Sequence, residues 1–143
     1  MAWLNFAVLT IIFYSLFDFF LKISSDKINT WLNAFIINLV ATALLLAFII
    51  YAKFQGEKLF DIKPYGLLFS VLAGLAVGGA SIFFVKMFAT GTNLSTGVPL
   101  VRIGMVVVGS LLGIFLLKEG VNLKYLLGLA LSICGLFLVI TAR

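Results

Sequence analysis

Long runs of apolar residues separated by short polar stretches make up most of this chain. Five such runs can be separated, and each has roughly the 20 residues that a helix needs to cross a hydrocarbon layer about 30 Å thick. The pattern predicts helices over about residues 2–23, 31–52, 65–88, 97–117 and 124–141. Pro64 is expected at the start of the third helix, where its missing N–H is tolerated. The expected fold is therefore an all-α integral membrane protein with five transmembrane helices, forming a single domain over residues 1–143.

Composition supports the membrane assignment and limits the chemistry. The chain is 64% hydrophobic and only 10% charged, with a mean hydropathy of +1.26, whereas soluble domains are about 25% charged. It contains no histidine, and no paired carboxylates or metal-ligand cluster take its place. The lone Cys134 lies within an apolar run and is interpreted as a packing residue. We therefore expect no enzyme activity, no cofactor and no metal site.

The basic residues stand singly near the ends of the apolar runs, which favours interfacial anchoring over nucleic-acid binding. We call the side of the membrane where the chain begins side A and the opposite side, side B. Side A then carries five basic residues, which are Lys53, Lys58, Lys63, Lys118 and Lys124. Side B also carries five, which are Lys22, Lys27, Lys86, Arg102 and Arg143. The count becomes five against four if the embedded Arg102 is left out. Because a positive charge bias sets topology, this near balance leaves open both a single orientation and insertion in two opposite orientations.

Polar residues embedded in the apolar runs fall at similar depth on different predicted helices. Thr10, Tyr14, Asp18 and Lys22 are spaced four apart and form one stripe on the first helix. Asp18 is about five residues from side B, roughly 7–8 Å deep, and Arg102 is placed about as deep on the fourth helix. Asn38 on the second helix is expected near the same level, with Lys22 and Lys86 closer to the surface.

This polar layer supports two interpretations. In one, Lys22 and Lys86 extend to the interface, and Asp18 pairs with Arg102 or Lys22 to hold helices together. In the other, the layer is a polar cavity open toward side B, since intramembrane ionisable residues are functional candidates. Three basic groups against one acid would suit an anionic or zwitterionic ligand. Aromatic residues are candidates for lining such a cavity: Phe13, Phe17, Trp31 and Phe84.

Several short motifs resemble the drug/metabolite transporter superfamily. They are Leu94-Ser95-Thr96-Gly97-Val98-Pro99, Leu117-Lys118-Glu119, Leu127-Gly128 and Cys134-Gly135. Together they are similar to the last two helices of an EamA-type repeat, and the five predicted helices correspond to one such repeat. The first helix, ending in Lys22-Ile23-Ser24-Ser25, is also similar to the small multidrug resistance branch. The resemblance implies a membrane transporter rather than an enzyme, in the cell membrane and, by analogy, in a prokaryotic inner membrane.

At one position of the first helix the sequence differs from the small multidrug resistance exporters, and this difference bears on the substrate. Small multidrug resistance exporters carry a glutamate in the first helix, where this chain has Tyr14, and its acid, Asp18, comes one turn later. Proton-coupled export of cationic drugs is therefore not expected. The superfamily's lipid-linked aminosugar flippases keep a second function open, in which basic residues bind a polyprenyl-phosphate head group. A third is a membrane assembly partner that transports nothing.

Full-length members of the superfamily contain two five-helix repeats of opposite orientation, with the site between them. A chain that resembles one repeat and has little charge bias is expected to pair with an inverted copy of itself or with a sister chain. The predicted partners are therefore membrane lipid, a small-molecule or lipid-phosphate substrate, and a second chain in a homodimer or heterodimer. The predicted substrate-binding residues are Tyr14, Asp18, Asn38, Arg102, Lys86 and Lys22.

Overall fold

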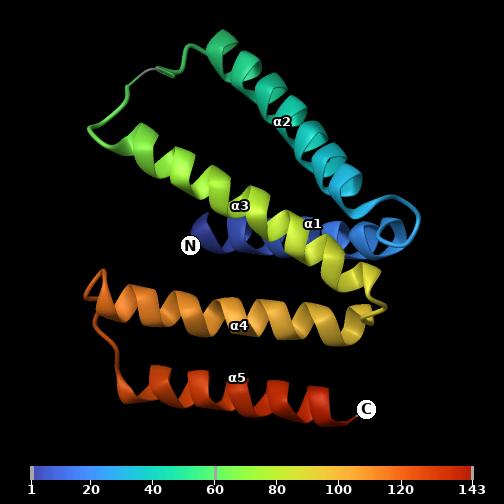
Figure 1. Ribbon diagram of the computed structural model, residues 1–143. Helices are drawn as coiled ribbons and strands as arrows, with labels where there is room; N and C mark the ends of the chain where they lie inside the picture. Colours follow the sequence, from blue (N-terminus) through green and yellow to red (C-terminus); the bar gives the residue numbers. More distant parts are fainter. Residues whose placement is uncertain (1, 60, 143) are drawn as a thin grey trace. The chain divides into compact units, whose positions relative to one another are not determined.

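The computed structural model describes residues 2–59 and 61–142, and within these ranges the chain forms five α-helices and no strand. Their bounds are α1 Ala2–Ser24, α2 Thr30–Phe54, α3 Gly66–Ala89, α4 Leu94–Phe115 and α5 Leu123–Thr141 (Figure 1). All five are long and apolar enough to cross a membrane. The predicted all-α, five-helix membrane fold is therefore confirmed, while the expected side-B residue Arg143 lies outside the described residues.

Asparagine side chains cap the N-termini of two of the helices. The Asn29 side chain accepts a hydrogen bond of 3.0 Å from the Trp31 N–H at the start of α2. The Asn122 side chain accepts one of 2.8 Å from the Tyr125 N–H at the start of α5. Because the first N–H groups of a helix have no partner within the helix, these two side chains help fix where α2 and α5 begin.

The starts of α3 and α4 differ from the predicted positions. Tyr65 adopts a left-handed conformation with φ of 63°, so α3 begins at Gly66 and Pro64 lies before the helix instead of in its first turn. On α4, the Gly97 N–H donates to the Asn93 carbonyl at 2.9 Å. The helix therefore begins at Leu94, three residues earlier than predicted, and Pro99 lies inside it.

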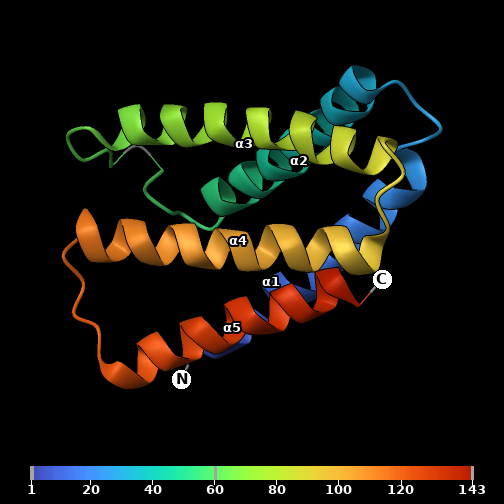
Figure 2. The same cartoon turned by 60° about the horizontal axis from the view of Figure 1, so that its bottom comes forward.

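The chain forms two compact units, the first extending to Gly91 and the second beginning at Thr92. In the first unit α3 packs against both α1 and α2. Figures 1 and 2 show α2 and α3 close together where α2 begins and α3 ends, and apart toward the loop that joins them. The buried side chains of this unit gather at that closed end, which is side B: Asp18, Leu21, Ser25, Asn33, Ala34, Val85 and Phe88. The single domain expected from the sequence stays a prediction.

The second unit is a pair of packed helices, α4 and α5. The hydroxyl groups of Ser110 and Tyr125 lie 2.6 Å apart and link the two helices. At the elbow between them, the Glu119 N–H donates to the Gly113 carbonyl at 3.1 Å, and Lys118 has a φ of 55°. Gly113 is buried, and the Glu119 carboxylate lies against it.

Most large apolar side chains outside these packed regions are exposed, from Trp3 in α1 to Ile140 in α5. In a soluble protein, exposed apolar patches of this extent would indicate a binding surface. In a chain with five apolar spans they are the side chains that lipid surrounds. Because lipid is as apolar as leucine, the helices of such a chain associate through close packing and hydrogen bonds.

Candidate functional site

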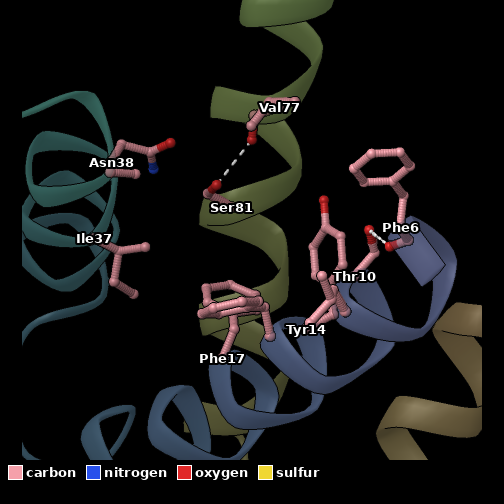
Figure 3. A pocket seen from close by; sticks show the side chains of 11 residues that line it. Phe6, Thr10, Tyr14, Phe17, Ile37, Asn38, Val77 and Ser81 are labelled. Atoms are coloured by element: carbon pink, nitrogen blue, oxygen red, sulfur yellow. Dashed lines mark hydrogen bonds between the residues drawn. The ribbon is translucent and has the colours of Figure 1, made fainter. Parts of the chain in front are cut away.

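A pocket of about 520 Å³ lies between α1, α2 and α3 in the first unit (Figure 3). That volume is within the range of about 300–1,000 Å³ that is usual for small-molecule sites. One face of α1 supplies more than half of the lining, and α2 and α3 supply the rest. The lining residues are Phe6, Leu9, Thr10, Phe13, Tyr14 and Phe17 on α1, Ile37, Asn38 and Ala41 on α2, and Val77 and Ser81 on α3.

The polar residues of this pocket lie near the middle of their helices. Asn38 is eight residues after the first residue of α2, and Ser81 is eight residues before the last residue of α3. At 1.5 Å per residue, both lie about 12 Å from the side-B ends of their helices. Tyr14 lies ten residues before the end of α1, so about 15 Å from the same side. The pocket is therefore at the depth where secondary transporters bind their substrates, near the bilayer midplane.

Hydrogen bonds within each helix hold the small polar side chains of the lining in place. The Thr10 hydroxyl donates to the Phe6 carbonyl at 2.8 Å, and the Ser81 hydroxyl donates to the Val77 carbonyl at 2.9 Å. The Asn38 amide donates to the Ala34 carbonyl at 2.8 Å. Figure 3 shows Asn38 extending from α2 toward Ser81 on α3, and Tyr14 extending from α1 into the space between the helices.

A row of aromatic rings runs from the pocket to the closed end of the unit. The ring of Tyr14 lies 6.3 Å from that of Phe17, which lies 6.3 Å from that of Phe84. Phe84 in turn lies 5.1 Å from Phe88. The row ends at Lys22, whose ammonium lies 5.7 Å from the centroid of the Phe88 ring. Packed rings therefore connect the wall of the pocket to the charged side-B end of α1.

The structure brings together two of the six predicted site residues in this pocket, Tyr14 and Asn38. Lys86 lines a second pocket of about 230 Å³ beside the start of α2, together with Trp31. Lys22 donates to the Phe88 carbonyl at 3.5 Å.

The other two predicted residues are on different units. Asp18 is buried in the first unit, with 3% of its surface exposed. Arg102 is a partly buried residue of α4, in the second unit. The assignment of all six residues to one substrate site stays a prediction.

The predicted site residues did not include most of the apolar lining or two of its polar residues, Thr10 and Ser81. The α1 part of the lining had a usable signal, because Phe6, Thr10, Phe13, Tyr14 and Phe17 follow the spacing of one helical face. Phe13 and Phe17, suggested as lining residues, do line the pocket. Ser81 carried no comparable signal, because a serine in an apolar helix commonly bonds to its own backbone.

Comparison with known proteins agrees with this architecture. The sequence matches the EamA-like transporter family over residues 1–141. It is also 29% identical over 138 residues to a Sinorhizobium sp. protein described as an uncharacterized transporter in the cobO 3′ region, and the aligned part is 96% of each chain. No solved structure matches the chain. Because the family match spans nearly the whole sequence, the chain belongs to the EamA-like transporter family of the drug/metabolite transporter superfamily, and it is a multi-pass membrane transporter rather than an enzyme.

Proposed function

We propose that this transporter moves a small zwitterionic or anionic solute across a prokaryotic inner membrane by alternating access, and that it does so as a dimer. The observation that carries the proposal is the pocket between α1, α2 and α3, which combines a suitable volume with amide and hydroxyl groups at mid-membrane depth. A site at that depth is what alternating access requires, since substrate must be reachable from each side in turn.

The packing of the first unit supports a state closed toward side B. The buried residues Leu21, Val85 and Phe88 lie at that end, each with 2% or less of its surface exposed. The row of aromatic rings separates the pocket from Lys22. Opening on side B would then require α1 and α3 to separate at these contacts, while the pocket lining moves with the helices that carry it.

The charged residues complete the proposed site. From the sequence pattern we assign Lys22, Lys86 and Arg102 to the anionic part of the solute, and Asp18 to the balance of their charge. The support is that each lies on or at the end of a membrane-spanning helix, where an ionisable side chain is costly and is usually retained for function.

The dimer follows from the architecture of the superfamily, in which two repeats of opposite orientation form one transporter. Five helices correspond to one repeat, and the near balance of basic residues between the two sides favours an antiparallel pair. The relative from Sinorhizobium sp. aligns over 96% of its own length, so a protein of about the same length is described as a transporter.

Transport by the purified chain in proteoliposomes tests this proposal. Counterflow of radiolabelled amino acids as zwitterionic probes, or of succinate as an anionic probe, is expected with the unaltered chain. Asp18→Asn and Arg102→Ala should abolish it. The matched control Lys124→Ala, at the start of α5, should leave it unchanged. Unaltered counterflow in both site variants would remove the site assignment.

Two further outcomes would replace the transport of small solutes with another function. Co-purified polyprenyl-phosphate lipid, together with no counterflow of any probe, would identify a lipid flippase or its subunit. The second outcome is that the unaltered chain shows no counterflow, while a variant with Asp18 and Arg102 exchanged still folds and forms dimers. That outcome would identify an assembly partner in which the polar layer only holds helices together.

A further inference from the structure

The hydrogen-bond arrangement of the pocket indicates which chemical group it accepts, and this inference rests on the proposed transport function. A hydroxyl group has one hydrogen to donate and lone pairs to accept with. Thr10 and Ser81 have each donated that hydrogen to a carbonyl of their own helix. Toward the pocket, both oxygen atoms can therefore act only as acceptors.

Asn38 adds a third acceptor from the remaining helix. Its amide nitrogen donates one hydrogen to Ala34, which leaves the carbonyl oxygen and one N–H of the side chain for a ligand. α1, α2 and α3 thus each contribute one acceptor oxygen to the same pocket, from Thr10, Asn38 and Ser81. The remaining polar group of the lining is the Tyr14 hydroxyl.

The apolar part of the lining has the same electrostatic preference. Phe6, Phe13 and Phe17 line the pocket from α1, and the faces of aromatic rings attract cations through their quadrupoles. Among the described residues, no charged side chain lines this pocket. An anion placed here would meet the lone pairs of Thr10 and Ser81 and the aromatic rings, with the second Asn38 N–H as a donor, whereas a cation that donates hydrogen bonds would meet an acceptor oxygen on every helix.

We propose that this pocket binds the protonated primary amine of the transported solute. A primary ammonium carries three N–H donors, the same number as the acceptor oxygens supplied by Thr10, Asn38 and Ser81. Of the two substrate classes proposed above, this selects the zwitterion. The anionic group of such a solute then needs partners other than the residues that line this pocket.

Binding to the purified full-length chain in detergent tests the proposal with three probes of similar size that share a phenyl ring. Benzylammonium, benzyl alcohol and benzoate present a cationic, a neutral and an anionic group on one ring. Titration calorimetry at pH 7 should show benzylammonium binding at least about tenfold more tightly than either of the others. Equal affinities, tighter binding of benzoate, or no binding of benzylammonium would overturn the proposal.

Conservative variants locate the binding in this pocket. Ser81→Ala and Thr10→Val each remove one acceptor, and Thr10→Val also keeps the side chain's size, so each should weaken benzylammonium binding about tenfold, as expected for a hydrogen bond to a charged group. Matched controls are Ser132→Ala and Thr141→Val, whose hydroxyl groups also donate to a carbonyl four residues earlier but lie on α5. An equal loss in the controls would overturn the assignment to the pocket.

This test separates the inference from the proposed function. Calorimetry measures affinity without any transport step, so tight benzylammonium binding in a chain that transports no probe would contradict only the transport proposal. Transport of succinate by a chain that binds benzylammonium no better than benzoate would contradict only the amine site.

Discussion

The ammonium group of Lys22 lies 3.5 Å from the carbonyl oxygen of Phe88 and 5.7 Å from the centroid of the Phe88 ring. One cation near the end of α1 therefore holds the end of α3, 66 residues further along the chain. The position is favourable, because the last carbonyl groups of a helix lack partners within it and carry partial negative charge. Phe88 is 1% exposed, so this contact joins the best-packed part of the first unit.

Replacing Lys22 by methionine keeps most of the side chain's length and removes its charge. We expect a loss of about 1 kcal/mol in stability, the usual scale for a cation over an aromatic ring combined with a helix end. Thermal unfolding in detergent, followed by circular dichroism, measures the change. The exposed Lys27 gives the matched control, Lys27→Met, which should leave the melting temperature unchanged. If Lys22 contacts only substrate, its replacement will lower substrate affinity and leave unfolding unaffected.

Gly113 and Glu119 provide a second prediction, at the elbow between α4 and α5. A Cβ atom on Gly113 would lie 2.5 Å from a carboxylate oxygen of Glu119, so alanine must displace that side chain. Glycine to alanine in a helix otherwise gains up to about 1 kcal/mol. We therefore expect Gly113→Ala to gain nothing alone and to become stabilising when combined with Glu119→Ala. A double-mutant cycle of melting temperatures measures this coupling, and strictly additive effects would contradict it.

Other helix glycines test the proposed dimer. A Cβ atom on Gly74, Gly78, Gly109 or Gly128 would have no neighbour within 4 Å among the described residues. Because small residues let helices approach closely in lipid, we expect leucine at one of these positions to convert the dimer to monomer while the chain stays folded. Light scattering in detergent measures the mass, and helical content by circular dichroism serves as the control. A dimer that persists in all four variants would show that none of these glycines lies at its interface.

Orientation in the membrane gives the last prediction. With five basic residues assigned to each side, an antiparallel homodimer requires the chain to insert both ways. Fusing a cytoplasm-specific and a periplasm-specific reporter to the C-terminus should then yield activity from both. Adding two lysines to the Lys53–Lys63 loop should shift the population to one orientation, since positive charge is retained inside. Activity of one reporter alone in the unaltered chain would point to a parallel dimer or a sister chain.

The number and type of helices could be predicted from the sequence because both depend on local properties. A segment of about 20 apolar residues in lipid must satisfy its own backbone groups, and a helix does so without any other segment. Helix starts were less predictable where one residue's conformation decides them. The left-handed Tyr65 excludes Pro64 from α3, and the bond from Gly97 to Asn93 moves the start of α4 to Leu94.

The candidate site depended on distances between helices, which no local pattern encodes. Tyr14 and Asn38 were both named from the sequence as candidate substrate-binding residues, and both line the pocket. Ser81 joined them only because α3 packs against both other helices of its unit. In sequence, Ser81 is indistinguishable from Ser132, which makes the same bond to its own helix on α5.

The amino-acid order by itself thus determined that the chain lies in a membrane, that it crosses as helices, and which residues are polar at each depth. Tertiary structure alone decided which of those polar groups meet, and that Lys22 contacts the carbonyl of Phe88 at the end of α3. The physical reason is that backbone hydrogen bonds are completed within each helix, whereas the choice of neighbours depends on how side chains of different helices fit together.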